Sequence, residues 1–139
     1  RQANERAGMT RVNVSSGSPY EKPIGFSLAS RMGNNIAVAG TAPISVESTT
    51  ACPGDPYGQT KQCINITQAA IEDAGGRAED VIRTRIMLTD ISRCEDAARA
   101  HGEYFGEIRP ACTFVEVSAL IQPEWLVEME ADALVVENQ

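Results

Sequence analysis

Apolar and small side chains recur every three or four positions between residues 60 and 74, which is the spacing of one face of an α-helix. Asp55-Pro56 precedes this segment, and a capping residue followed by proline is typical of the first turn of a helix. Gly75-Gly76 follows it, and glycine readily takes the left-handed conformation found just past a helix. The pattern therefore predicts a helix between Asp55 and Gly75.

A second helix is predicted after a strand-like segment that runs from Val81 to Thr89. Ser92-x-x-Glu95 has the spacing of a capping box, in which two side chains bind the free N–H groups at the start of a helix. Gly106 and Pro110 would end this helix. Its expected inner face comprises Cys94, Ala97, Ala98, His101, Tyr104 and Phe105.

The other periodic segments have strand patterns, and together with the helices they indicate an α+β fold. Gly33-Asn34-Asn35 is a turn signal that joins the first two strands as a hairpin. The order of elements is ββαβαββ, and two helices cannot cover both faces of five strands, so we predict a mixed sheet with both helices on one face. We expect residues 19–139 to form this single domain and residues 1–18, which lack periodicity, to form a flexible N-terminal arm. The four further strands are expected at 24–32, 36–40, 112–119 and 126–136.

The sheet face without helices is predicted to be charged, because the side chains of a strand point alternately to its two faces. In the strand after Asp80, Ile82 and Thr84 would face the helices, while Arg83 and Arg85 would face away from them. This open face is either exposed to solvent or forms an interface between subunits whose charges line clefts. Its expected residues include Arg83, Arg85, Cys112, Phe114, Glu116, Glu128, Glu130 and Asp132.

Composition excludes several classes of protein. With 139 residues and 42% hydrophobic residues, the chain is long and apolar enough for one folded domain. The formal net charge of −7 makes a nucleic acid an unlikely partner, because phosphate backbones require a basic surface. No stretch of about 18 apolar residues is present, so we expect no membrane-spanning segment.

The scarcity of histidine and the spacing of the cysteines limit the chemistry further. His101 is the only histidine, and the cysteines at 52, 63, 94 and 112 form no C-x-x-C pair, so no metal site is expected. Because no apolar signal segment is evident, we interpret the cysteines as reduced thiols and expect a cytoplasmic location. Any catalysis would then depend on a carboxylate and a shaped cleft.

Short motifs recur along most of the chain in a specific order and spacing. They are 33–40, Gln59-x5-Asn65-Ile66, Gly76-x3-Asp80-Val81-Ile82, Thr89-Asp90, Tyr104-Phe105, Arg109-Pro-Ala111, Val115-Glu-Val117 and 127–130. In order and spacing, these motifs are similar to those of the Rid/YjgF family, also called the L-PSP family, from about Ser16 to Val136. The resemblance implies a chorismate-mutase-like fold, assembled as a homotrimeric β-barrel with the helices outside and ligand clefts between subunits. It also implies hydrolysis of reactive imines or enamines to a keto acid and ammonia, without a cofactor, so the expected partners are copies of the chain itself and a small molecule.

The resemblance also implies which residues line the cleft. Glu128 matches the family's cleft glutamate, which would orient or deprotonate water. Ala39-Gly40 matches a Ser-Gly segment whose backbone approaches the ligand, and Phe26 takes the place of a cleft tyrosine. Deaminating members carry an arginine that clamps the substrate carboxylate where this chain has Cys112. We therefore expect a substrate other than the standard 2-aminoacrylate type.

Further candidate residues have alternative interpretations. Cys112 is either a nucleophile or a wall of the cleft, together with its neighbours Thr113 and Phe114. His101 is either a hydrogen-bonded core residue or part of the cleft. Arg31 and Arg109 either supply the missing positive charge or form ion pairs elsewhere.

Two alternatives to a hydrolase remain at this stage. The first is a trimer that binds a small ligand in the same clefts without turning it over. The second is an L-PSP-type endoribonuclease, which the net charge of −7 disfavours.

Overall fold

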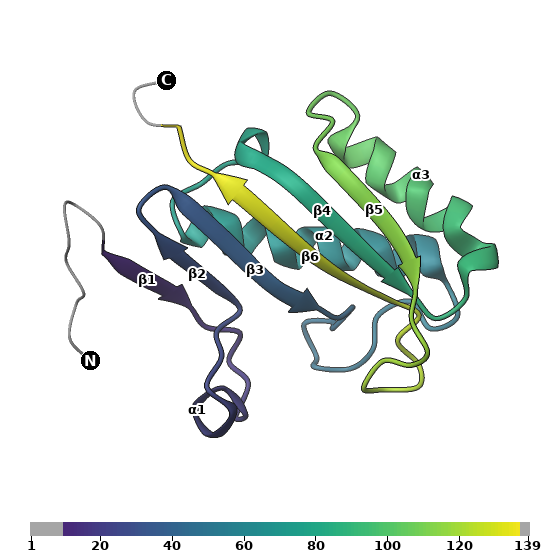
Figure 1. Cartoon of the computed structure of the whole chain (residues 1–139). Coiled ribbons are helices and arrows are strands. Elements are labelled where there is room, and N and C mark those ends of the chain that lie inside the picture. The colour runs from purple at the N-terminus through teal and green to yellow at the C-terminus, as the bar shows by residue number, and fades with distance from the viewer. Residues whose placement is uncertain (1–9, 137–139) are drawn as a thin grey trace.

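Six strands form one mixed sheet in the computed structural model, which describes residues 10–136 (Figure 1). The order across the sheet is β1-β2-β3-β6-β4-β5. Neighbouring strands are antiparallel except for β4 and β5, which are parallel. The strands are β1 (Arg11–Val14), β2 (Ala29–Met32), β3 (Asn35–Thr41), β4 (Val81–Leu88), β5 (Ala111–Glu116) and β6 (Val127–Leu134).

Two long helices, α2 (Pro56–Asp73) and α3 (Cys94–Phe105), lie on the same face of this sheet (Figure 1). The predicted α+β class and the placement of both helices on one face are therefore confirmed. Three short helical turns complete the structure: α1 (Glu21–Ile24), η1 (Ala78–Asp80) and η2 (Ile91–Arg93). Within residues 10–136, no helix is long and apolar enough to cross a bilayer.

Helix α2 begins and ends where its flanking residues predict. Pro56 opens the helix after Asp55, and Gly75 follows it with a φ of 93°, which only glycine adopts readily. The guanidinium of Arg31 donates to the carbonyl oxygen of Ala74 at 2.9 Å, which satisfies one of the free acceptors at this end of the helix.

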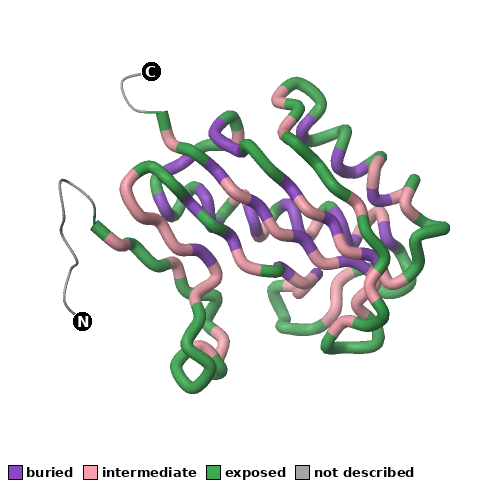
Figure 2. The backbone as a smooth tube through the Cα atoms, viewed as in Figure 1, coloured by how far each residue is buried: buried purple, intermediate pink, exposed green. Residues whose placement is uncertain are grey.

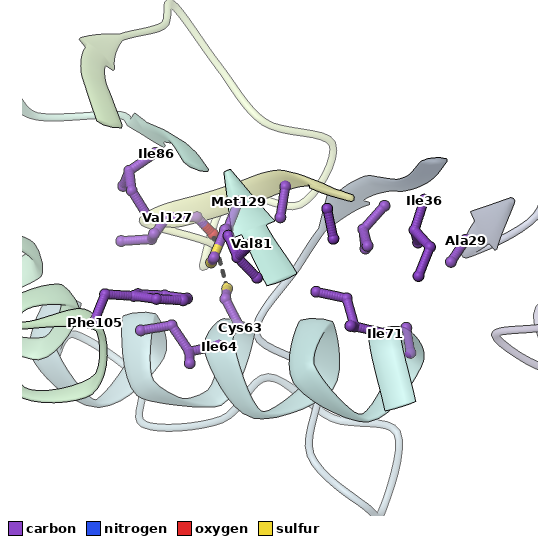
Figure 3. Packing of buried hydrophobic residues seen from close by; sticks show 14 of the residues in the cluster. Ala29, Ile36, Cys63, Ile64, Ile71, Val81, Ile86, Phe105, Val127 and Met129 are labelled. Atoms are coloured by element: carbon purple, nitrogen blue, oxygen red, sulfur yellow. Dashed lines mark hydrogen bonds between the residues drawn. The ribbon is translucent and has the colours of Figure 1, made fainter. Parts of the chain in front are cut away.

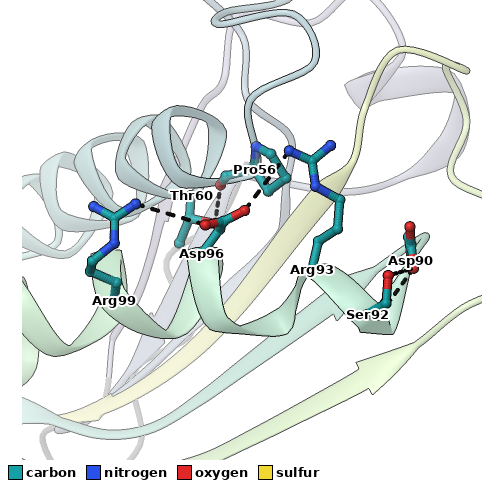
Figure 4. A network of polar contacts seen from close by, with 7 residues as sticks. All are labelled: Pro56, Thr60, Asp90, Ser92, Arg93, Asp96 and Arg99. Atoms are coloured by element: carbon teal, nitrogen blue, oxygen red, sulfur yellow. Dashed lines mark hydrogen bonds and ion pairs between the residues drawn. The ribbon is translucent and has the colours of Figure 1, made fainter.

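Helix α3 begins differently from the prediction. The carboxylate of Asp90 accepts hydrogen bonds from both the backbone N–H and the hydroxyl of Ser92, so the predicted capping box is wrong (Figure 4). These bonds hold Ser92 within η2, and the residue that precedes α3 is Arg93, whose side chain caps nothing. Asp96 instead lies 3.8 Å from both Arg93 and Arg99 in exposed ion pairs.

The hydrophobic core lies between the sheet and the two helices (Figure 3). Alternate residues of β6 point into it and are almost fully buried, as the strand pattern predicts, whereas Tyr104 of the expected inner face of α3 is exposed. Along the backbone, the buried positions concentrate on the central strands and the inner sides of the helices (Figure 2). The largest side chains of the core include Ile36, Ile64, Ile71, Ile86, Leu88, Val127 and Met129.

The N-terminal region is more structured than the sequence indicates. Strand β1 lies within the predicted arm, and the segment predicted as a strand at 24–32 contains the end of α1 and then β2. The carboxylate of Glu21 accepts hydrogen bonds from the hydroxyl of Ser15 and from the backbone N–H and hydroxyl of Ser16. These bonds lower the pKa of Glu21 and connect the segment after β1 to α1. The rest of the predicted arm, residues 1–9, lies outside the described residues.

Two strands present different side chains to the core than alternation alone predicts. An irregularity in the pairing of β4 with β6 between Val81 and Arg83 buries Val81 and leaves Ile82 53% exposed. In β5, Cys112 lies opposite Thr84 and Phe114 lies opposite Ile86, so both residues are on the helix side of the sheet.

The predicted placement of Cys112, Phe114 and Glu116 on the open face is therefore wrong. Strand β5 is the edge strand, and an apolar residue such as Val115 stays 37% exposed there without a core to face. Phe114 packs against the core instead, and Glu116 accepts a hydrogen bond from the backbone N–H of Ile91.

Candidate functional site

A hollow of about 550 Å³ opens on the helix-free face of the sheet, where the segment after α1 meets β2 and β3. Phe26 and Ala39, two of the predicted cleft residues, both line it. Phe26 is 39% exposed and supplies an aromatic wall. Polar groups from Asn13 and Ser30 line the same hollow, so its surface is mixed in character.

Glu128 lies beside this region, on β6 and opposite Met87 of β4. A Cβ atom added at Gly40 would lie 2.5 Å from Oε1 of Glu128, so only glycine leaves room for the carboxylate in this position. The pairing of β3 with β6 is irregular between Val38 and Thr41, where this close approach occurs. The structure therefore brings together Glu128, Gly40 and its neighbour Ala39, three of the residues that the family resemblance assigns to the cleft.

The other carboxylates of β6 are paired, whereas Glu128 is not. Arg85 contacts Glu130 at 2.5 Å, and Arg83 lies 3.7 Å from Asp132. Among residues 10–136, no cation lies within ion-pair distance of Glu128. Arg83 and Arg85, the two arginines of the neighbouring strand, therefore pair with the other two carboxylates of β6 and not with Glu128.

The environment of Glu128 suits a carboxylate that accepts protons. Burial raises its pKa, and the negative charge of Glu130 raises it further. A base is most effective when its pKa lies close to the working pH, so both causes favour a catalytic use of Glu128. The carboxylate remains half-buried rather than enclosed, which leaves it accessible from the open face.

A second group of predicted residues lies on the opposite face of the sheet. His101 of α3 is 9% exposed, and its Nε2 lies 2.7 Å from the hydroxyl of Thr84 on β4. The imidazole packs against Phe105 and Phe114, with ring centroids 4.7 and 6.0 Å away. Cys112 lies opposite Thr84 in the parallel ladder of β4 and β5. Within one chain, Cys112, Phe114 and His101 are therefore separated from Glu128 by the sheet.

The remaining predicted residues are dispersed. Thr113 pairs with Arg85 across β5 and β4 and faces the open side. Arg109 is exposed, with a φ of 56°, and its backbone N–H bonds the carbonyl oxygen of Phe105 in the turn after α3. Arg31 faces the helices, where it donates to the carbonyl oxygens of Gly33 and Ala74. Its contacts are those of a residue that stabilises the end of α2.

Gln59 is a positioning residue that the sequence analysis did not identify as part of the site. Its side chain is fully buried, donates to the carbonyl oxygen of Glu124 at 3.0 Å and accepts from the backbone N–H of Leu126 at 2.8 Å. These bonds fix the chain as it enters β6, two residues before Glu128. The available signal in the sequence was that Gln59 belongs to one of the family motifs. The structure shows why a glutamine fits there, because a fully buried polar side chain needs hydrogen-bond partners.

The described part of the chain contains no cluster of three or more histidine, cysteine or acidic side chains arranged to hold a metal ion.

Comparison of the sequence with known proteins identifies a family and several relatives. The family model described as Endoribonuclease L-PSP matches residues 20–135. A RutC family protein of Pyrococcus abyssi is 42% identical over 113 residues, which cover 81% of this chain and 88% of the relative. An uncharacterized protein of Streptomyces coelicolor is 38% identical over 120 residues, which cover 86% of this chain and 89% of the relative.

Solved structures agree with these sequence matches. A member of the YjgF/YER057c/UK114 family from Mycobacterium tuberculosis superposes with a TM-score of 0.81 and 43% identity, covering 90% of this chain and 99% of that one. The YjgF gene product of E. coli gives a TM-score of 0.75 at 23% identity, covering 88% of this chain and 93% of that one, which shows a common fold.

Proposed function

Since this chain belongs to the Rid/YjgF/L-PSP family, in which small-molecule processing or binding is the common role, we propose that it hydrolyses an imine, an enamine or a related small metabolite. The reaction takes place in clefts between the subunits of a homotrimer. The observation that carries the proposal is the unpaired Glu128 carboxylate, held against Gly40 with a raised pKa.

The arrangement of the predicted residues supports a cleft that two subunits share. Glu128 and Cys112 lie on opposite faces of one sheet, so a single chain cannot direct both at one small molecule. Strand β5 ends the sheet, and an unpaired edge strand readily meets another chain. A neighbouring copy that brings its β5 edge to the open face would complete the cleft in a cyclic trimer.

The chemistry needs one base and a positioned water molecule. The carbon of a protonated imine is already electrophilic, so no cofactor is required. Glu128 accepts a proton from water as the water oxygen bonds to this carbon, and the C=N electron pair moves to nitrogen. The protonated carboxyl then returns its proton to the nitrogen, and the regenerated carboxylate takes the proton of the new hydroxyl as the C–N bond breaks and the carbonyl forms. The amine that leaves is ammonia from an open-chain imine or the tethered amino group of an opened ring from a cyclic imine, and it takes up the proton held by Glu128.

The substrate differs from a carboxylate-bearing imine of the standard type. Cys112 stands where deaminating members carry an arginine, and a neutral thiol does not bind a carboxylate as a guanidinium does. Phe26 and Ala39 give the open-face hollow apolar contacts. We therefore propose that the substrate is an imine without a carboxylate group, or a cyclic imine, and that the cleft recognises it mainly by its shape.

The test compares a panel of imines. The purified chain is incubated with a 2-aminoacrylate generator and with cyclic imines, and ammonia release or imine decay is followed. We expect acceleration with at least one cyclic imine and a loss of about 100-fold or more in Glu128→Gln, because a positioned base contributes that much. Glu47→Gln, an exposed loop variant, is the matched control and should retain full activity. Equal rates for the wild-type protein and Glu128→Gln on every substrate would contradict the proposal.

A ligand-binding protein without turnover is the second candidate. Ala39, Phe26 and Cys112 each replace a more polar group of the catalytic family members, which weakens the case for catalysis while leaving a hollow that binds small molecules. Native mass spectrometry of the purified protein would detect a bound metabolite. A metabolite that is retained and never converted would favour this function over hydrolysis.

An endoribonuclease, the activity in the description of the matching family model, is the weaker candidate. Arg83 and Arg85 of the open face are paired with carboxylates, and the net charge is −7, so few cations are available to phosphates there. RNA cleavage by the wild-type chain that is lost in Arg83→Ala and Arg85→Ala would support this function. Cleavage that persists in both variants would exclude a nuclease site on this face.

A further inference from the structure

One wall of the open-face hollow is a loop that is closed at its base. Residues 15–27 leave the sheet after β1 and return before β2, and the backbone N–H of Leu28 donates to the carbonyl oxygen of Val14 at 2.9 Å where the two ends meet. A compact surface loop with adjacent ends is an Ω-loop. Figure 1 shows α1 at the far end of this loop, away from α2 and α3. The loop residues that line the hollow are Glu21, Lys22, Gly25, Phe26 and Ser27.

The Ω-loop has little support from the hydrophobic core. Helix α1 contains no buried residue, and Tyr20 and Ile24 are 65% and 69% exposed. Phe26, the aromatic wall of the hollow, is also exposed. A segment with few buried apolar contacts opens at a low cost in free energy. The position of Phe26 therefore depends on polar contacts within the loop.

Glu21 connects the two halves of the Ω-loop. Its carboxylate accepts hydrogen bonds from the hydroxyl of Ser15 at 2.9 Å and from the backbone N–H and the hydroxyl of Ser16, both at 2.6 Å. Its backbone carbonyl oxygen accepts from the N–H groups of Gly25 at 2.7 Å and Phe26 at 3.0 Å. Gly25 makes the turn with a φ of 88°, a conformation that favours glycine. One residue thus couples the chain that leaves β1 to the position of Phe26.

Glu21 and Glu128 have opposite electrostatic environments. The hydrogen bonds of Glu21, above all that from the hydroxyl of Ser16, lower its pKa, so the carboxylate is ionised and keeps its three donors at neutral pH. Burial raises the pKa of Glu128 instead. A carboxylate with a lowered pKa is a weak base, so Glu21 is suited to holding the loop and not to proton transfer.

We propose that Glu21 is a positioning residue, which holds Phe26 as a wall of the hollow and thereby sets the affinity of the site for its small molecule. This inference rests on the proposed function, because it assigns a role within the same site. Without the carboxylate of Glu21, Phe26 occupies its place in only a fraction of the molecules, and the apparent affinity falls with that fraction. The rate of the bound substrate depends on Glu128 and stays nearly constant.

The test measures hydrolysis of cyclic imines, beginning with 3,4-dihydroisoquinoline, by the full chain. Glu21→Ala should raise KM about three- to tenfold and change kcat less than about twofold, because the lost hydrogen bonds support binding and not the chemical step. Ser16→Ala should raise KM less, and Ser16→Thr, which retains the hydroxyl, should restore the wild-type KM. Ser18→Ala is the matched control, because the hydroxyl of Ser18 accepts from the backbone N–H of Tyr20 and does not bond Glu21.

A double-mutant cycle separates positioning from a general loss of stability. Because Glu21 acts through Phe26, Glu21→Ala should add no further rise in KM to a protein that already carries Phe26→Ala. Effects on KM that multiply in the double variant would overturn the proposal. An unchanged KM in Glu21→Ala would overturn it as well.

Hydrogen exchange, followed residue by residue by NMR, separates this inference from the proposed function. The amides of Gly25 and Phe26 should exchange several-fold faster in Glu21→Ala than in the wild-type chain, while those of β3 keep their rates. Unchanged exchange at Phe26 overturns the positioning role whether or not the chain is active. Faster exchange supports the hold on Phe26 even if the wild-type chain hydrolyses no imine, a result that would contradict the proposed function alone.

Discussion

At the scale of single residues, Glu128 combines a useful chemistry with a cost to the fold. Its carboxylate is half-buried beside Gly40 and near Glu130, and no described cation compensates its charge. Burial of a charged group without a partner is unfavourable, so the carboxylate destabilises the fold when it is ionised. A group of this kind is therefore expected to favour activity at the expense of stability.

The substitution Glu128→Gln should stabilise the chain while it abolishes hydrolysis. Since the pKa of Glu128 is raised in the folded state, the unfolded chain releases this proton more readily, and stability falls as the pH rises above the ordinary value of 4.5. We expect a melting temperature a few degrees higher at pH 7, since about 1 kcal/mol corresponds to roughly 2–8 °C in domains of this size range. The difference from wild type should vanish below pH 4, as measured by thermal melts across pH.

Glu130 should change the pKa of the proposed base, Glu128, without itself accepting a proton from water. Its negative charge contributes to the raised pKa of Glu128, so Glu130→Gln should lower that pKa and move the acidic limb of the kcat/KM profile to lower pH. Release of Arg85 from its ion pair acts in the same direction. Asp132→Asn, which removes a carboxylate paired with Arg83, is the control and should leave the limb in place. A profile that moves to higher pH in Glu130→Gln would contradict this assignment.

At the scale of elements, the approach to β6 depends on helix α2. Gln59 connects the helix to the backbone at Glu124 and Leu126, just before the strand that carries Glu128. The hydrogen bonds use both ends of one amide, so no apolar side chain of similar shape can replace it.

We expect Gln59→Leu to lower the free energy of unfolding by about 2 kcal/mol, because two part-buried hydrogen bonds to the backbone at Glu124 and Leu126 are lost. The activity of the folded fraction should fall as well, since the start of β6 is no longer held. Gln68→Leu is the matched control on the same helix, because Gln68 bonds only Glu72 and its oxygen has no partner in residues 10–136. Urea unfolding of both variants measures the difference, and equal losses would refute the role of Gln59.

At the scale of the whole molecule, the proposed cleft takes Glu128 from one subunit and the β5 edge from the next. This division makes a prediction for mixed assemblies, because two inactive parents would carry complementary defects. Glu128→Gln removes the base, and Cys112→Trp blocks the cleft from the β5 side.

Co-refolding the two variants in equal amounts should restore about a quarter of wild-type activity, because roughly three quarters of cyclic trimers are mixed and each contains one intact site of three. Each variant refolded alone should be inactive. Decay of the imine that the wild-type protein hydrolyses measures the recovery, and native mass spectrometry reports the composition of the trimers. No recovery in confirmed mixed trimers would place the whole site within one chain.

How far the sequence predicts this protein differs from element to element. Helix α2 follows from the chain alone because its periodicity, its opening proline and its closing glycine are local signals. The start of α3 does not, because Asp90 caps the preceding turn η2 and draws Ser92 into it, which leaves α3 without a side-chain cap. Ile82 is misplaced for a similar reason, since an irregular pairing of β4 is invisible to alternation.

The sequence by itself determines the α+β class, the order of the long helices and of the strands from β2 onward, the family, and the identity of Glu128 beside Ala39-Gly40. Only the tertiary structure decides which side chains of the edge strand β5 face the helices. Because β5 has a neighbouring strand on one side only, the alternation of its apolar residues does not reveal which face packs against the core. That decision moves Cys112 away from Glu128 and beside Thr84 and His101. Contacts between residues distant in the chain depend on how the strands and helices pack, and no local pattern contains that information.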